Sequence, residues 1–278
     1  MNETESGLST DYPSSQGERL RAELEAMLRP AERPEQSGPS RADFNAHAQD
    51  VLTTLTTYRQ ERGLSRSQAI ALVEENYGSE AEDLDPSLVE LTGILIQIPD
   101  YHAATVRAER VKLSAHTRPL SNAEKTQFHA DKYFACGMNR QLIDMAHQHP
   151  GTFTRQDLKN WLAKGSSSNL TWASTISQGI ASEVAVTRAL QLHPRIADVE
   201  LPTIEDDMRG VDVIVRSDAD KTYALDVKSG HAQLGSGGLS AVNGKVELGV
   251  ASADVQEDFT LSRVGQAKLV MAVDQLIK

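Results

Sequence analysis

The hydrophobic and polar positions of this 278-residue chain follow two different patterns, which change near Gly165. Between residues 41 and 164 the apolar residues recur every three to four positions, the spacing typical of amphipathic helices. After Gly165 a long helical pattern is followed by short, valine-rich segments in which apolar and polar residues alternate, as they do in strands. The pattern therefore predicts an α+β protein in which the helices come first and the strands last.

Capping residues and chain breakers mark the ends of the predicted helices. Helices are predicted over residues 41–63, 65–78, 85–99, 121–150 and 154–165. Their N-terminal signals are a Ser40 cap, a Ser65/Gln68 capping box, Asp85 followed by Pro86, and a Ser121/Glu124 capping box. Their C-terminal signals are Gly63, Gly78, Pro99, Pro150 and Gly165. Residues 41–164 are therefore predicted to form an all-helical module.

The strand-like segments come after a helix predicted over residues 169–194. Strands are predicted near residues 197–202 and over 210–215, 222–228 and 245–251, and a helix over 261–277 follows them. A glycine-rich stretch, residues 229–244, separates the last two strands. Residues 165–278 are therefore predicted to form an α/β domain. Residues 1–40, rich in Ser, Gly, Pro and Glu, are predicted to be a disordered or linker segment with one short helix over 17–30.

Composition limits the cellular setting. The one cysteine, Cys136, cannot form an internal disulfide, which favours a reducing compartment. No apolar run approaches the roughly 18 residues of a membrane span, and the acidic, polar start lacks the features of a signal peptide. We therefore expect a cytoplasmic protein without a membrane partner, although delivery to another cell by a signal-independent route stays open.

The distribution of charge is more informative than its total. The net charge of −11 argues against a non-specific nucleic-acid binder. Residues 101–164, however, carry 10 Lys and Arg against 5 acids, whereas the segments on either side are net acidic. A polyanion would be bound largely by this middle segment. The candidate nucleic-acid-binding residues are Arg107, Arg110, Lys112, Arg118, Lys125 and Lys132, together with Arg209 near the strands.

Two aspartates interrupt the most strand-like segments of the chain, Asp212 in "RGVDVIV" and Asp226 in "YALDVKSG". Because side chains alternate between the two faces of a strand, Asp226 and Lys228 share a face. A three-residue hairpin loop would pair Ser217 with Lys221 and therefore Asp212 with Asp226, whereas a two-residue loop would put the aspartates on opposite faces. In the first register their Cβ atoms lie about 4.5–5.5 Å apart.

Two carboxylates this close repel each other unless a cation lies between them. Carboxylate oxygens suit Mg²⁺ or Mn²⁺, which also bind phosphate oxygens and water. Lys228, on the face of Asp226, could hold a water nucleophile or neutralise charge on a phosphate. The alternative is a solvated sheet face on which Lys228 is an exposed cross-strand partner.

The motif formed by Asp212, thirteen residues and then Asp226-Val227-Lys228 resembles that of the PD-(D/E)xK nuclease superfamily. The resemblance implies a restriction-endonuclease-like fold with a small mixed central sheet. It also implies that Asp212, Asp226 and the backbone carbonyl of Val227 bind the metal. Glu183, on the preceding helix, matches a family position that binds the metal directly or through water.

These observations favour a metal-dependent nuclease that hydrolyses phosphodiester bonds, with DNA as the favoured substrate. Its biological role could be that of a mobile-element, defence or toxin-like nuclease. The helical module could position the nucleic acid or bind a protein partner. Two alternatives stay open: a non-catalytic binding module for nucleic acid or protein on a degenerate nuclease fold, and a helical adaptor whose C-terminal domain is structural. Asp206 and Asp207 are interpreted as turn acids.

Overall fold

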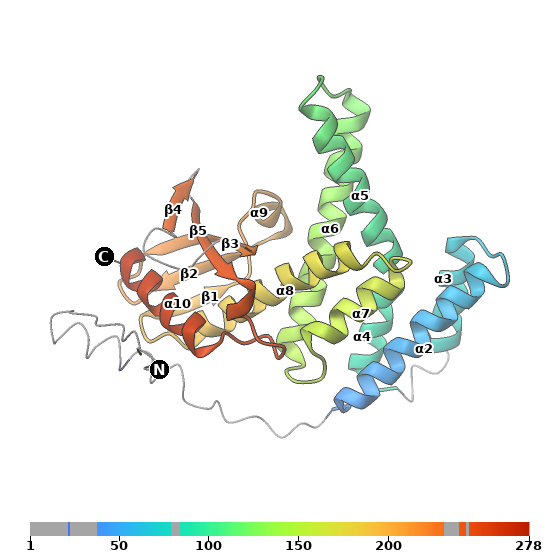
Figure 1. Ribbon diagram of the computed structural model, residues 1–278, viewed down its shortest axis with the longest axis horizontal. Coiled ribbons are helices and arrows are strands. Elements are labelled where there is room, and N and C mark those ends of the chain that lie inside the picture. The colour runs from blue at the N-terminus through green and yellow to red at the C-terminus, as the bar shows by residue number, and fades with distance from the viewer. Residues whose placement is uncertain (1–21, 23–37, 79–83, 231–238, 243–244, 278) are drawn as a thin grey trace, which may run out of the picture.

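The computed structural model describes Ala22 and residues 38–78, 84–230, 239–242 and 245–277, which form an α+β protein with a small mixed sheet (Figure 1). Apart from Ala22, the helix predicted over residues 17–30 lies outside the described residues, as does nearly all of the predicted linker. Among the helices that are described, none has the length and hydropathy needed to cross a bilayer.

Six helices form the described part of the chain between residues 41 and 165. They are α2 (Arg41–Gln60), α3 (Arg66–Gly78), α4 (Pro86–Leu95), α5 (Ile98–Ala115), α6 (Asn122–Gln148) and α7 (Arg155–Gly165). The predicted caps are observed. The side chains of Ser40 and Ser121 each accept from the backbone N–H three residues on, and Ser65 and Gln68 exchange hydrogen bonds. The local capping pattern therefore predicted correctly where these helices start.

The prediction that Pro99 ends a helix is wrong, and α5 was not predicted. Helix α4 ends at Leu95, and Pro99 lies in the first turn of α5. A proline lacks the backbone N–H that a helix interior needs, but the first turn does not use that donor, so Pro99 starts a helix here. Helices α5 and α6 pack together as a long hairpin that extends away from the sheet (Figure 1).

The sheet has the strand order β1-β2-β3-β5-β4. Its strands are β1 (Ile196–Glu200), β2 (Val213–Ser217), β3 (Thr222–Gly230), β4 (Leu239–Val242) and β5 (Lys245–Ala251). Strands β1, β2 and β3 pair antiparallel, β5 runs parallel to β3, and β4 pairs antiparallel with β5. The predicted mixed sheet is observed. Strand β4 was not predicted in its glycine-rich surroundings, because only its pairing with β5 reveals it.

One apolar core joins the helices to the sheet. Helix α8 (Leu170–Gln191) packs against β1, β2 and β3, and α10 (Arg263–Leu276) packs against α8. A continuous cluster of buried apolar side chains runs from Phe44 to Ile277. Helices α7 and α8 also pack together across the predicted boundary at residue 165. The division of the chain into a helical module and a C-terminal domain stays a prediction.

Candidate functional site: an acidic cluster beside the β2–β3 hairpin

The β2–β3 hairpin has the three-residue loop considered in the sequence. The backbone N–H of Ser217 donates to the carbonyl of Lys221 (2.9 Å), and Asp220 takes the left-handed conformation with φ +60°. Val213 pairs with Leu225 further along the ladder. Continued by one residue, this register places Asp212 beside Asp226. The register that puts the two aspartates on one face is therefore the one the protein adopts.

Asp212 stands where the two strands begin to separate. Strand β2 starts at Val213, and the Asp212 backbone N–H donates to the Leu225 carbonyl (2.8 Å). The Asp212 carboxylate Oδ2 accepts a hydrogen bond from the backbone N–H of Val227 (2.6 Å). A side chain thus occupies the position of a backbone acceptor, which fixes the Asp212 carboxylate against β3.

Asp226 is buried between two ammonium groups. Its side chain is 5% exposed, with Oδ1 lying 2.6 Å from the Nζ of Lys228 and Oδ2 lying 3.5 Å from the Nζ of Lys245. The Lys245 Nζ also donates to the backbone carbonyls of Arg209 (2.6 Å) and Gly210 (3.0 Å). Lys245 therefore ties the loop that carries Asp212 to the strand that carries Asp226.

Gly210 is favoured here by its backbone conformation. Its φ is +78°, and a Cβ built there would lie 2.7 Å from the Lys245 Nζ and 3.5 Å from Asp226 Oδ2. Any L-residue at this position would be strained and would press on the ammonium group. The glycine allows the loop backbone to approach Asp226 closely.

Two more acids complete the cluster, Glu183 from α8 and Asp207 from α9 (Ile204–Met208). Burial, followed by the charges of Asp212 and Asp207, raises the pKa of Glu183 well above its usual range. Burial also raises the pKa of Asp207. Asp212 titrates with a pKa of about 7, raised first by burial and then by Asp226 and Asp207, against the opposing hydrogen bond from Val227. These acids compete for protons because they are close together and only partly hydrated.

Helix α6 places two positively charged side chains and a thiol beside these acids. Lys132, Cys136 and Arg140 lie four residues apart and so share one side of this helix. The Lys132 Nζ donates to the carbonyl of Met208, and the Cys136 thiol lies close enough to Asp207 for the charge of Asp207 to raise its pKa. The positive charge of Arg140 opposes the rise in the pKa of both Glu183 and Asp207, without cancelling it. The predicted helical module therefore forms one wall of the acidic cluster.

Cys136 is an unreactive member of this wall. Burial, followed by the charge of Asp207, raises the pKa of its thiol to about 12. The thiolate, which is the reactive form, is therefore almost absent at neutral pH.

The donor set suits a hard divalent cation, because it consists of carboxylate oxygens and the Val227 carbonyl. In the ranges that the structure describes, no three His, Cys, Asp or Glu side chains form a group with the arrangement of a metal site. The sequence predicts a larger set, in which Glu183 joins Asp212, Asp226 and the Val227 carbonyl, and its three carboxylates do not form such a group. Burial, followed by the charges of Asp226 and Asp207, raises the pKa of Asp212. A cation bound there would favour the ionised carboxylate.

The structure separates the predicted nucleic-acid-binding residues. Four of them are engaged within the protein: Arg107 with Asp131, Lys112 with Glu109, Arg118 with Glu124, and Lys132 with the Met208 carbonyl. Arg110 and Lys125 form no ion pair with a described carboxylate. The Arg209 side chain is 76% exposed and lies 3.3 Å from Asp206. Much of the predicted basic surface is therefore neutralised locally.

Three residues of the cluster were missed by sequence reasoning. Asp207 was interpreted as a turn acid, although the Thr203 cap that starts α9 was a local signal for a short helix. Arg140 and Lys245 gave no local signal, because each reaches the acids only through the packing of a distant element.

Comparison of the chain with protein-family models, with curated proteins and with solved structures finds no match.

Proposed function

We propose that this protein is a metal-dependent nuclease of the PD-(D/E)xK type with a restriction-endonuclease-like fold. The observation that carries the proposal is the hairpin register, which brings Asp212 beside Asp226 with Lys228 on the same strand. Two further features support it: α8 supplies Glu183 to the same cluster, and β5 runs parallel to β3. Substrate and activity follow from the chemistry of these residues.

Asp212, Asp226 and the Val227 carbonyl would hold Mg²⁺ or Mn²⁺, which would offset charge on the scissile phosphate and make a bound water more acidic. Lys228, whose side chain is 51% exposed, can turn its ammonium group toward a phosphate oxygen or an attacking water. The raised pKa of Glu183 favours its protonated form, which can donate a hydrogen bond. Lys245 and Gly210 position the two aspartates.

The favoured substrate is DNA, and the biological setting would be a mobile element, a defence system or a toxin-like effector. We place the activity in the cytoplasm, a proposal that rests on the single, buried free thiol of Cys136. The α5–α6 hairpin would contact the nucleic acid through Arg110 and Lys125 or would bind a protein partner.

A second function has one observation in its favour. Both carboxylate oxygens of Asp226 face ammonium groups, Lys228 on one side and Lys245 on the other. Such neutralisation also suits a non-catalytic module on a degenerate nuclease fold, which would bind nucleic acid or protein without cleaving it. Metal binding at Asp212 separates the two functions.

The test is cleavage of supercoiled plasmid DNA with Mg²⁺ or Mn²⁺. The wild-type protein should nick or linearise the plasmid, and Asp226→Ala should not. The matched control is Asp220→Asn in the hairpin turn, where the side chain is 85% exposed, and it should cleave like the wild type. Equal residual cleavage by wild type and Asp226→Ala would rule out this site as the source of activity.

A further inference from the structure

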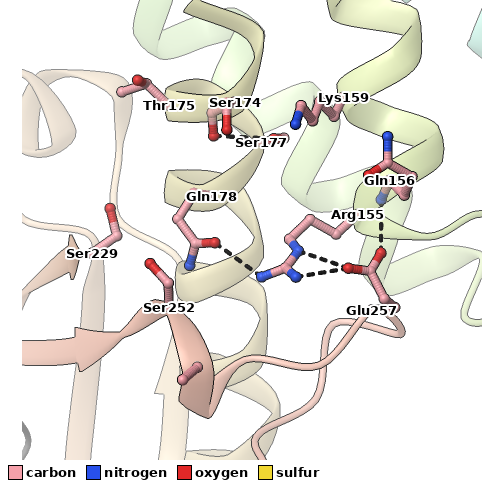
Figure 2. A pocket seen from close by; sticks show the side chains of 11 residues that line it. Arg155, Gln156, Lys159, Ser174, Thr175, Ser177, Gln178, Ser229, Ser252 and Glu257 are labelled. Atoms are coloured by element: carbon pink, nitrogen blue, oxygen red, sulfur yellow. Dashed lines mark hydrogen bonds and ion pairs between the residues drawn. The ribbon is translucent and has the colours of Figure 1, made fainter. Parts of the chain in front are cut away.

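A polar cleft lies at the junction between α7, α8 and the carboxyl end of β3 (Figure 2). Its volume is about 590 Å³, within the range of ligand sites in proteins. Hydroxyl and amide side chains line most of it, including Gln156, Ser174, Thr175, Ser229 and Ser252. The short 3-10 helix η1 (Ser252–Asp254) closes one side. None of the described residues that line this cleft belongs to the acidic cluster.

The wall formed by Arg155 is rigid and electrically balanced. Arg155 binds Glu257 through two nitrogens (2.7 and 3.2 Å) and donates to Gln178 (2.9 Å), as Figure 2 shows. The second Glu257 oxygen accepts from the backbone N–H of Gln156 (2.9 Å). Since Arg155 and Glu257 neutralise each other, neither gives the cleft a net charge.

Lys159 gives the cleft its positive charge. It is half-buried on α7, and its side chain points toward α8 in Figure 2. Among the described residues, no carboxylate forms an ion pair with it. An ammonium group held at a hydroxyl-lined cleft without a protein counter-ion is a site for an anion.

The side chains that line the cleft favour one type of anion. Lys, Ser, Thr and Gln side chains are the groups that contact the phosphates and sugars of nucleic acids. Bases, in contrast, are held by stacking on aromatic side chains, and none of the described lining residues is aromatic. The cleft is therefore suited to a sugar–phosphate backbone and not to a base.

Its position relates the cleft to the acidic cluster. Strands β3 and β5 are parallel, and both end at this cleft. Ser229 is three residues after Asp226, or about 10 Å along the strand. Because side chains alternate, Ser229 lies on the opposite face of β3 from Asp226 and Lys228. A nucleic-acid strand rises about 3.4 Å per nucleotide, so a few nucleotides span this distance.

We propose that this cleft binds a backbone phosphate of the nucleic-acid strand whose scissile bond lies at the acidic cluster, with Lys159 as its cation. This inference rests on the proposed nuclease function, because it assigns the cleft a part of that substrate. The contact would be independent of base sequence and would fix the position of the strand along β3.

The experiment measures the affinity of a fluorescein-labelled, single-stranded DNA oligonucleotide of about sixteen nucleotides. Titrations in EDTA at several salt concentrations exclude cleavage. Lys159→Gln should weaken binding about three- to tenfold and reduce the slope of log Kd against log salt by roughly 0.7, the value for one lost contact to a single strand. Lys159→Arg should restore both values. Lys221→Gln, the same charge change at an exposed position just before β3, should match the wild type.

Thermal melting confirms that each variant is folded. Unchanged affinity and salt slope in Lys159→Gln would overturn the cleft assignment while leaving plasmid cleavage untouched. If the wild type binds the oligonucleotide through Lys159 but does not cleave plasmid with Mn²⁺, the nuclease proposal fails and the phosphate site stands. If the wild type does not bind DNA, both proposals fail.

Discussion

The two sides of the acidic cluster differ in how their negative charge is met. On the Asp226 side, two lysines lie at 2.6 and 3.5 Å from one carboxylate. On the other side, burial raises the pKa values of Asp212, Glu183 and Asp207, and neighbouring carboxylates raise those of Asp212 and Glu183 further. The Asp212 carboxylate accepts a hydrogen bond from a backbone N–H. The contrast indicates where a bound cation would add most. Two ammonium groups pair with Asp226, whereas no described ammonium group forms an ion pair with Asp212.

The largest expected effect comes from Lys228, on the well-neutralised side. Lys228→Ala removes an ammonium group that would act on charge developing in the transition state, so turnover should fall by about 10²–10³. The Kd for DNA should stay nearly unchanged, because this side chain contributes little to ground-state binding. Single-turnover plasmid cleavage and oligonucleotide binding measure the two quantities. Lys221→Ala in the hairpin turn is the control, and equal losses in the two variants would contradict the assignment.

Replacing Lys245 tests how much the second ammonium group beside Asp226 contributes to stability. Lys245→Met leaves Asp226 with one cation and frees the Arg209 and Gly210 carbonyls, so we expect a loss of about 2 kcal/mol in unfolding free energy. For a chain of this size the melting temperature should fall by roughly 4–8 °C. Lys245→Arg should have a melting temperature between those of Lys245→Met and the wild type. Lys221→Met is the control and should melt at the same temperature as the wild type. A melting temperature equal to that of the wild type would show that Lys245 does not hold the two segments together.

The pH dependence of folding stability tests the Asp212 side of the cluster. Its folded pKa is about 7, whereas the unfolded chain loses this proton near pH 4. Between about pH 4 and 7 the folded state binds more protons, so its stability falls as the pH rises through that window. Asp212→Asn keeps an acceptor for the Val227 N–H but cannot ionise. In EDTA it should be more stable than the wild type by about 1–2 kcal/mol at pH 8 and equal near pH 4.

Thermal melting at several pH values in EDTA measures this difference, and a constant offset across the pH range would contradict the assigned titration. Adding Mn²⁺ should then stabilise the wild type by mass action and stabilise Asp212→Asn much less. Equal stabilisation of both proteins would mean that the ion binds elsewhere.

The smallest expected effect belongs to the α5–α6 hairpin. Arg110 and Lys125 are the two predicted phosphate contacts there that form no ion pair with a described carboxylate. Replacing both with Ala should lower the salt slope of duplex DNA binding by roughly one per contact and leave turnover at saturating substrate unchanged. Arg118→Ala should have less effect, since Arg118 is paired with Glu124. An unchanged slope in the double variant would favour a protein partner for the hairpin.

The sequence could determine those features that depend on near neighbours. Helix starts at Ser40 and Ser121 follow from capping within one turn, and the faces of β2 and β3 follow from alternation. The hairpin loop connects residues only a few positions apart, so the sequence narrowed its register to two alternatives. One of these places Asp212 beside Asp226, so local spacing was enough to indicate the candidate site.

Only the tertiary structure decided how the charges of the site are balanced. Arg140 on α6, Asp207 on α9 and Lys245 on β5 reach one cluster from segments far apart in the chain. Their approach depends on how helices and strands pack, which no local spacing encodes. The pKa of Asp212 depends in turn on that packing, because burial and the neighbouring acids raise it together. Local spacing thus predicted Asp212 and Asp226, and long-range packing determines the pKa of Asp212.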